Sequence, residues 1–409
     1  MGRKRKNRRN PKKKPPKGRP QKPSGKSDSK LVPQFNAQKS SSAGGYSGIL
    51  EINEKGYGFL RKFNHEFTIK KQDPFVPVTM VQRLYLRPGL IIDASIEADD
   101  KNNYRVSEIT SVNNKPVTEW AKARRFELQT PIMPIEQLKL SMRADETEMR
   151  VVDLIAPVGK GQRALIVAPP RTGKTVLLKQ IASAIENYHK KVELAVLLID
   201  ERPEEVTDFM RTTSGKVFAS SNDNNVESHT RITEMALGYA KRKAEMGGDV
   251  VLLMDSLTRM GRAYNAAQKS SGRTMSGGLD LRALEIPKRV FGSARKIEGG
   301  GSLTIIATCL IETNSRMDDL IFEEFKGTGN MELVLDRELA NDRIYPAINI
   351  ALSGTRNEEK FIDESAEERN VLRRYLLKKA PKDSMLSLLQ VLKRTDSNRD
   401  LLEQLSSLA

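Results

Sequence analysis

Apolar runs of strand length alternate with stretches of helical periodicity through the second half of the chain. The runs are ALIVA (164–168), LAVLLID (194–200), VVLLMD (250–255) and LTIIATCLI (303–311). Between them, stretches such as TVLLKQIASAIENY (175–188) and HTRITEMALGYAKRKAEM (229–246) place apolar residues at helical spacing. Strands that are apolar throughout are typical of a parallel sheet covered by helices on both faces. The pattern predicts an α/β domain over 151–409, which ends in helices such as MLSLLQVLKR (385–394).

A different pattern precedes this domain. Short apolar stretches, GILEIN (48–53), YGFLRKF (57–63), LIIDASIEA (90–98) and YRVSEITSV (104–112), are separated by Gly, Asn, Asp and Pro. This spacing predicts a small all-β unit, a barrel or a sandwich, over 46–115. Residues 116–150, which contain Pro131 and Pro134, are expected to form a connector in which Trp120 is a packing anchor.

The positive charge is concentrated in the first thirty residues. They hold 14 Lys and Arg and one acid, Asp28, which leaves only +4 of the net charge of +17 for the rest of the chain. With one hydrophobic side chain, Met1, this segment cannot form a core, and we expect a disordered arm and linker over 1–45. Like charge on such an arm favours contact with a polyanion, first of all a nucleic acid, over a solubilising tail or an import signal.

Several classes of protein are excluded by what the sequence lacks. No apolar run follows the basic start as in a secretory signal, and none has membrane length. The one cysteine, Cys309, lies in an apolar run and is expected to be a core residue, and three scattered histidines make no zinc pattern. We expect a soluble, cytoplasmic protein that does not bind membranes.

The stretch APPRTGKT (168–175) lies where a buried strand gives way to a helix, as in a phosphate-binding P-loop. Ala168 stands in place of the usual opening glycine and is followed by Pro169 and Pro170. The backbone N–H groups that matter most are expected to be those from Thr172 to Val176, so the prolines stiffen the loop upstream at little cost to phosphate binding. We therefore predict a working site for a nucleoside triphosphate.

Acidic residues end two neighbouring apolar runs. Asp255 closes VVLLMD, as a carboxylate that anchors Mg²⁺ requires, and Glu201 follows LAVLLID, where it could polarise an attacking water. In the predicted site Lys174 neutralises the β- and γ-phosphates and the Thr175 hydroxyl binds Mg²⁺. Each acid alone could be a solvated turn residue, but acids at two strand ends together with Lys174-Thr175 favour a nucleotide site.

The stretch EKGYGFLRKF (54–63) indicates a second binding surface. Alternate residues of a strand share a face, so Tyr57, Phe59 and Arg61 should lie on one side, with Gly58 and Leu60 on the other. Two aromatic rings beside an arginine suit base stacking with a phosphate contact next to it. The alternative, that the rings belong to the barrel core, is disfavoured by Arg61 on their face.

An aromatic β-surface followed by a P-loop domain resembles the bacterial transcription termination factor Rho family. The resemblance runs from about Tyr46 to the C-terminus and rests on motifs in family order, namely APPRTGKT, LLIDERPEEV, DSLTR, RAYN, GGSLTIIAT, EEFKGTGNMEL and YPAINIALSGTR. It implies a homohexameric ring with a RecA-like ATPase domain and an OB- or cold-shock-like barrel. Such a ring hydrolyses ATP with Mg²⁺ while pulling single-stranded RNA through its centre, 5′ to 3′, to release it from RNA polymerase, with elongation factors as further candidate partners.

The resemblance also assigns roles to residues. Lys174 and Thr175 become the Walker A pair, Glu201 the catalytic glutamate and Asp255 the Walker B carboxylate. Arg356 becomes the arginine finger that acts on a neighbouring subunit, with Arg202 in the coupling network beside it. The remaining nucleotide contacts would come from Pro170, Arg171, Thr172, Gly173, Val176 and, stacked on adenine, Tyr345.

RNA would be bound at two places in the resemblance. The primary site takes Tyr57, Phe59, Arg61, Phe75 and Tyr104, and two central-pore loops take Arg273, Thr274 and Gly277 in SSGRTMSGG (270–278) and Arg316 in TNSRM (313–317). The chain departs from the family in two respects. A basic arm replaces the small helical subdomain that many members carry, and Asn102 and Asn103 stand where an acid is expected near Tyr104.

Two other functions remain open from the residues. One is a non-catalytic RNA-binding protein that resembles a cold-shock module and holds ATP as a structural ligand, in which Glu201 would have no use. The other is a subunit of a rotary ATPase, which would have no use for the basic arm and the aromatic surface.

Overall fold

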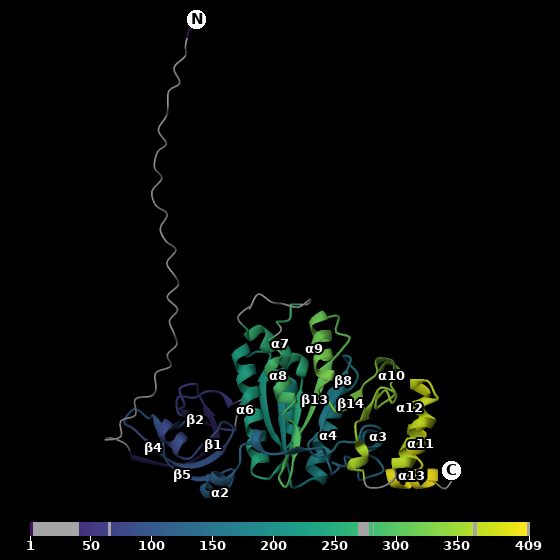
Figure 1. Ribbon diagram of the computed structural model, residues 1–409, viewed down its shortest axis with the longest axis horizontal. Coiled ribbons are helices and arrows are strands. Elements are labelled where there is room, and N and C mark those ends of the chain that lie inside the picture. The colour runs from purple at the N-terminus through teal and green to yellow at the C-terminus, as the bar shows by residue number, and fades with distance from the viewer. Residues whose placement is uncertain (3–40, 64–66, 269–277, 281, 363–365, 407–409) are drawn as a thin grey trace. The chain divides into compact units, whose positions relative to one another are not determined.

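The computed structural model describes residues 1–2, 41–63, 67–268, 278–280, 282–362 and 366–406 of the chain. Figure 1 shows its helices and strands and labels many of them. Most of the arm predicted over 1–45 lies outside the described residues. Residues 41–45, at the end of that range, are not a linker, because they belong to the first strand, which begins at Ser41.

The first sheet is a small closed barrel, which confirms the predicted OB-like unit. Its strand order is β3-β2-β1-β4-β5-β6, and a further pairing of β3 with β5 closes it. Leu50 of β1 pairs with Leu60 of β2, and both are fully buried in the barrel core. The elements are β1 Ser41–Ile52, β2 Gly58–Arg61, β3 Phe75–Val76, α1 Val78–Arg83, β4 Ile91–Ala98, β5 Tyr104–Val112, β6 Lys115–Pro116 and α2 Val117–Lys122.

The first part of the predicted connector packs against the barrel. Trp120 of α2 is 1% exposed, packs in the barrel core and donates its indole N–H to the Leu84 carbonyl at 3.2 Å, so its predicted role as a packing anchor is confirmed. The chain then passes through the 3₁₀-helix η3 Phe126–Leu128 and strand β7 Pro131–Ile132, and β7 pairs with β12 Arg295–Ile297 of the second sheet.

The second sheet has the parallel core that the sequence predicts. Its order is β10-β9-β11-β13-β8-β14-β15; neighbours from β10 to β14 run parallel, whereas β15 is antiparallel to β14. The four apolar runs became β8, β9, β11 and β13, while β10 and β14 were not predicted. The strands are β8 Arg163–Ala168, β9 Val192–Glu201, β10 Lys216–Ser221, β11 Asp249–Asp255, β13 Ser302–Leu310, β14 Met331–Val334 and β15 Gly354–Thr355.

Helices cover both faces of this sheet. Successive strand residues alternate between two apolar clusters: Ile166 and Val196 pack with α4, whereas Leu165 and Leu197 pack with α6. Cys309 is fully buried in the second cluster, as predicted, and burial raises its pKa to about 12. The helices are α3 Thr147–Ile155, α4 Lys174–Tyr188, α5 Pro203–Thr212, α6 Val226–Glu245, α7 Leu257–Ala267, α8 Glu285–Phe291, α9 Arg316–Lys326, α10 Arg337–Asn341, η4 Glu358–Lys360, α11 Ala366–Leu377, α12 Pro381–Leu392 and α13 Asn398–Ser406.

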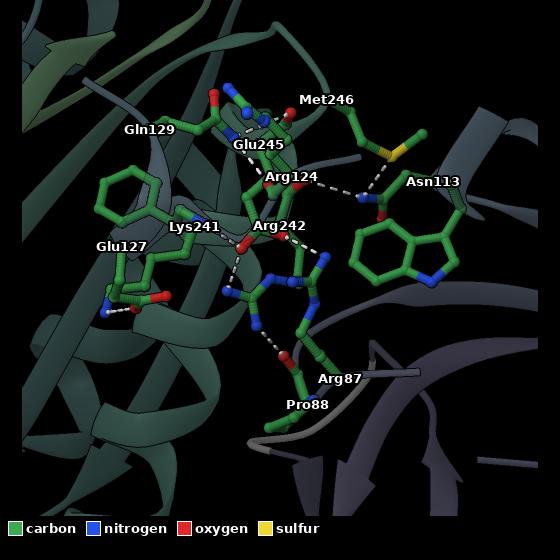
Figure 2. A network of polar contacts seen from close by, with 12 residues as sticks. Arg87, Pro88, Asn113, Arg124, Glu127, Gln129, Lys241, Arg242, Glu245 and Met246 are labelled. Carbon is green, nitrogen blue, oxygen red and sulfur yellow. Dashed lines mark hydrogen bonds and ion pairs between the residues drawn. The ribbon is translucent and has the colours of Figure 1, made fainter. Parts of the chain in front are cut away.

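A buried carboxylate, Glu245 of α6, joins the barrel to the α/β domain (Figure 2). Its Oε1 accepts hydrogen bonds from the Phe126 backbone N–H (2.7 Å) and from Arg242 (2.6 Å), and its Oε2 lies 3.1 Å from Nη2 of Arg87. The Arg87 guanidinium stacks 4.3 Å from the centroid of the Trp120 ring. One carboxylate therefore pairs with two arginines and ties α6 to the barrel and to the connector.

The backbones of the two domains also meet directly. Gly89 has φ +92°, and a Cβ atom there would lie 2.1 Å from the carbonyl carbon of Gly238 on α6. No side chain fits at this position, so the barrel rests on the helix at backbone distance.

Candidate functional site

The loop after β8 forms an anion cradle although the opening glycine is absent. The left-handed φ values fall on Arg171 (+67°) and Gly173 (+88°), while Ala168 ends the strand in an ordinary conformation. The buried Thr172 hydroxyl donates to the Pro169 carbonyl at 2.8 Å, which holds the arch of the loop. Helix α4 then begins at Lys174, and the free N–H groups of a helix start favour an anion such as phosphate.

Lys174 meets the acid that the sequence places at the end of β11. Its Nζ forms an ion pair with Oδ1 of Asp255, and the same oxygen accepts a hydrogen bond from the Thr308 hydroxyl at 2.8 Å. The Thr175 hydroxyl, one residue along the helix, points to Glu205 at 3.5 Å. The structure thus brings both predicted metal ligands, Thr175 and Asp255, to the same edge of the sheet as the cradle.

Glu201 ends the neighbouring strand β9 and is 2% exposed. Its Oε1 lies 3.0 Å from Nη2 of Arg259 and accepts the backbone N–H of Arg202 at 3.3 Å. Burial, and then the charge of Asp255, raise the pKa of Glu201 above its usual range. A carboxyl group with a raised pKa is better suited to accept a proton from water.

The free oxygens of these two acids fit a nucleotide with a divalent cation. Within the described part of the chain, Oε2 of Glu201 and Oδ2 of Asp255 are buried and have no hydrogen-bond partner. Buried carboxylate oxygens need a partner, which a cation or a water can supply. Among the described residues no three His, Cys, Asp or Glu side chains gather into a metal cage. Mg²⁺ needs none, since it takes one or two protein ligands and completes its shell with phosphate and water oxygens.

Other predicted contacts line the rim of the cradle. Tyr345 is 42% exposed, and its ring lies 3.7 Å from where a Cβ atom of Gly173 would be, so a flat aromatic surface flanks the loop. Pro170, Arg171 and Val176 are exposed on the loop and the first turn of α4. Arg202 is exposed at the start of α5, beside Glu201.

Arg356 is not brought to this cradle. It follows β15, is exposed, and its backbone N–H donates to the Asn330 carbonyl at 3.0 Å, next to the start of β14. The structure therefore separates Arg356 from Lys174 and Glu201 of the same chain.

Three rings form an aromatic cluster on the barrel. The centroids of Tyr57, Phe59 and Phe75 lie 5.4 to 5.8 Å apart, and β2 pairs with β3 at Phe59↔Phe75. Phe59 and Phe75 are partly exposed, whereas Tyr57 is 5% exposed and supports them from within. Tyr104 begins β5 and is half-buried against the barrel core, one residue from the position that pairs with Phe75. The partly exposed rings are available for base stacking.

Arg61 lies on the face of these rings, as the sequence predicts. The predicted phosphate contact is not supported, because its guanidinium is not free in this structure. It is 5% exposed and pairs with Glu51 (2.6 Å) and Asp73 (2.7 Å), and its Cζ lies 4.7 Å from the Phe59 ring centroid. Two acids that are distant in sequence neutralise it, so in this structure it supports Phe59 from behind.

The predicted pore residues are only partly described. Arg273, Thr274 and Gly277 lie outside the described residues. Arg316 is exposed at the first position of α9, after β13.

Sequence reasoning missed three residues of the nucleotide site. Arg259 holds Glu201, Thr308 holds Asp255, and Glu205 receives the Thr175 hydroxyl. Thr308 could have been noticed as a polar residue within an apolar strand, whereas the other two depend on contacts between separate elements.

Two family models match the chain, one over each domain. The Rho termination factor, RNA-binding domain, matches residues 46–118, and the ATP synthase alpha/beta family, nucleotide-binding domain, matches residues 148–355.

Curated relatives match almost the whole chain. A transcription termination factor Rho from Cereibacter sphaeroides is 45% identical over 89% of this chain and 87% of its own length. One from Aquifex aeolicus is 47% identical over 88% of this chain and 84% of its own length.

Solved structures share the fold at lower identity. An ATPase from the type III secretion system of pathogenic bacteria gives a TM-score of 0.55 at 21% identity, over 68% of this chain and 88% of its own. An ATP synthase subunit from Nanoarcheaum equitans gives 0.55 at 17% identity, over 68% and 76%. Both confirm the RecA-like fold of the α/β domain.

None of the described helices is both long and apolar enough to cross a bilayer.

Proposed function

The chain belongs to the transcription termination factor Rho family, and we propose that it is an RNA-stimulated ATPase that moves along single-stranded RNA and releases it from RNA polymerase. Among the described residues, one buried carboxylate oxygen of Glu201 and one of Asp255 have no hydrogen-bond partner, and this observation carries the proposal. The other oxygen of Asp255 pairs with the P-loop Lys174, and the same chain has an aromatic surface on its barrel. The active form would be a homohexamer in the cytoplasm, where RNA polymerase, with its elongation factors, would be its partner.

In the proposed mechanism the cradle binds the triphosphate through the N–H groups from Thr172 to Val176. Lys174 would leave its ion pair with Asp255 and contact the β- and γ-phosphates instead. Asp255 and Thr175 would then hold Mg²⁺, which would supply positive charge to the phosphate oxygens. Glu201, held by Arg259, orients the attacking water and accepts its proton. Tyr345 flanks the base, and Arg171 contacts the phosphates from the rim.

RNA would be bound at two places. Phe59 and Phe75, with Tyr57 and Tyr104 behind and beside them, would stack bases at the barrel. The segment with Arg273, Thr274 and Gly277, and Arg316 at the start of α9, would contact RNA in the centre of the ring. Arg202 would link the catalytic glutamate to the neighbouring subunit, which contributes Arg356.

An ATPase assay with and without pyrimidine-rich single-stranded RNA tests the proposal. We expect RNA to stimulate hydrolysis, and Glu201→Gln to remove hydrolysis while leaving ATP binding nearly intact. Hydrolysis indifferent to RNA would instead fit a rotary-ATPase subunit. Binding of RNA and ATP without hydrolysis would fit an RNA-binding protein with a structural nucleotide.

A further inference from the structure

Glu51 of the barrel is shared by two arginines from different domains. Its Oε2 lies 2.6 Å from Nε of Arg61, on β2. Its Oε1 pairs with Nε of Arg231, on α6 of the ATPase domain, and Nη2 of Arg231 donates to Oε2 at 3.0 Å. Arg231 also donates to the Phe67 carbonyl at 3.0 Å, so it is anchored to the barrel at two points.

The arginines and their acids form a neutral cluster. Asp73 accepts a hydrogen bond from Nη1 of Arg61 at 2.7 Å, which completes a set of two cations and two anions. Burial acts to raise the pKa of Glu51, but the hydrogen bond from Arg231 and the charge of Arg61 outweigh it and lower that pKa. Without Arg231 the cluster would carry a net negative charge, and Glu51 would be free to take both of its oxygens to Arg61.

This cluster contacts the aromatic surface through Arg61. Arg61 stacks 4.7 Å from the Phe59 centroid, and Phe59 is one of the partly exposed rings. Since Arg61 reaches Glu51 and Asp73 at the same time, its position behind Phe59 depends on how the Glu51 carboxylate is held. The residue that holds the other side of that carboxylate belongs to the ATPase domain.

We propose that Arg231 is a positioning residue for RNA binding, which neutralises Glu51 and so fixes Arg61 behind Phe59. The inference rests on the proposed function, in which Phe59 and Phe75 bind RNA. It makes the RNA-binding surface a product of both domains, because a residue of the ATPase domain sets the charge and geometry behind a surface that lies entirely on the barrel.

The test measures the affinity of the full-length protein for a fluorescently labelled pyrimidine-rich RNA oligonucleotide at fixed salt. We expect Arg231→Gln to weaken binding about fivefold, since it leaves an unbalanced negative charge behind the surface. The double variant Arg231→Gln with Glu51→Gln restores neutrality and should recover most of the affinity. The control Lys241→Gln removes one positive charge from the same helix, in the ion pair with Glu127, and should change affinity less than about twofold. Trp120 fluorescence verifies that each variant is folded.

Three results would overturn the proposal. These are unchanged affinity in Arg231→Gln, no recovery in the double variant, and a loss in Lys241→Gln as large as that in Arg231→Gln, which would reduce the effect to bulk charge. Failure of the proposed function is a separate result. If the wild-type protein and Phe59→Ala bind RNA equally poorly, the barrel surface is not an RNA site, whatever Arg231 does.

Discussion

Arg356 and Gly173 of one chain lie at opposite ends of strand β8. The cradle with Gly173 follows Ala168, the last residue of β8, whereas the Arg356 N–H bonds to the Asn330 carbonyl and the Asn330 N–H bonds to the carbonyl of Arg163, the first residue of β8. A strand of six residues separates these ends by roughly 16 Å, which is beyond the reach of an arginine side chain. The proposed role of Arg356 at a nucleotide therefore requires the cradle of another copy of the chain.

We accordingly expect Arg356→Ala to lower kcat by about 10³-fold or more while ATP affinity stays close to that of the wild type, because arginine fingers stabilise charge in the transition state. Mixing Arg356→Ala with Lys174→Ala protein should restore some activity, since mixed interfaces can pair an intact cradle with an intact finger. Steady-state kinetics and nucleotide titration measure both effects. Loss of ATP binding with normal turnover, or no complementation on mixing, would place Arg356 outside this role.

The partly exposed rings should dominate RNA binding at the barrel. Phe59→Ala and Phe75→Ala should each weaken binding of a short single-stranded RNA by about 1–3 kcal/mol, the usual contribution of one stacked base. Tyr375→Ala, which removes an exposed ring from α11, is the matched control and should leave affinity unchanged. Fluorescence anisotropy with the labelled oligonucleotide measures all three. If the control loses as much affinity as the barrel variants, stacking at the barrel is not the cause.

Apolar runs that alternate with stretches of helical periodicity were enough to predict much of the fold. The four apolar runs were long and uninterrupted, and each became a strand of the parallel core. Strands β10 and β14 were missed because KVFASS has only three consecutive apolar residues and MELV is only four residues long, so neither gives a run that stands out from its flanks. Their place in the sheet depends on neighbouring strands.

The residues of the candidate site likewise fall into those that local sequence predicts and those that depend on how the strands pair. Lys174 could be found from the P-loop motif, and Glu201 and Asp255 because each lies at the end of an apolar run. Parallel strands bring their carboxyl ends to one edge of the sheet. Arg61 was placed on the correct face, but alternation says nothing of Glu51 and Asp73. These acids reach Arg61 only through the pairing of β1, β2 and β3, and that pairing turns a predicted phosphate ligand into a buried support for Phe59.

The junction in Figure 2 should be a major source of stability for the barrel. Glu245→Gln leaves the buried Arg242 and the partly buried Arg87 with no counter-charge from this residue, and breaking a buried pair in this way costs about 3–5 kcal/mol. Trp120 is the only tryptophan of the chain and contacts Arg87, so its fluorescence during urea unfolding reports on this junction. The matched control, Glu127→Gln, removes a largely exposed acid at the same junction and should cost about 1 kcal/mol or less. Equal shifts of the two unfolding midpoints would contradict the assignment.

Asp153 should make stability depend on pH with a sign opposite to that of an ordinary paired carboxylate. Burial raises its pKa to about 6, from a usual value of 3.8, against the hydrogen bonds from Leu140 and Ser141 that act to lower it. Between these two values the folded state binds more protons than the unfolded state, so stability falls as pH rises, by at most about 1.4 kcal/mol per pH unit. The contribution of Asp153 is thus fully present below about pH 4 and is lost as pH rises through about 6.

Asp153→Asn removes this titration. The free energy of unfolding of the wild type minus that of the variant should therefore be largest at low pH and fall as pH rises. Asp145→Asn, which removes a carboxylate that is 72% exposed, should run parallel to the wild type and serves as the control. Urea unfolding at a series of pH values between about 4 and 7 gives both differences. Parallel curves for wild type and Asp153→Asn would mean that Asp153 does not titrate in this range. Its three hydrogen-bond donors would then hold it ionised in spite of its burial.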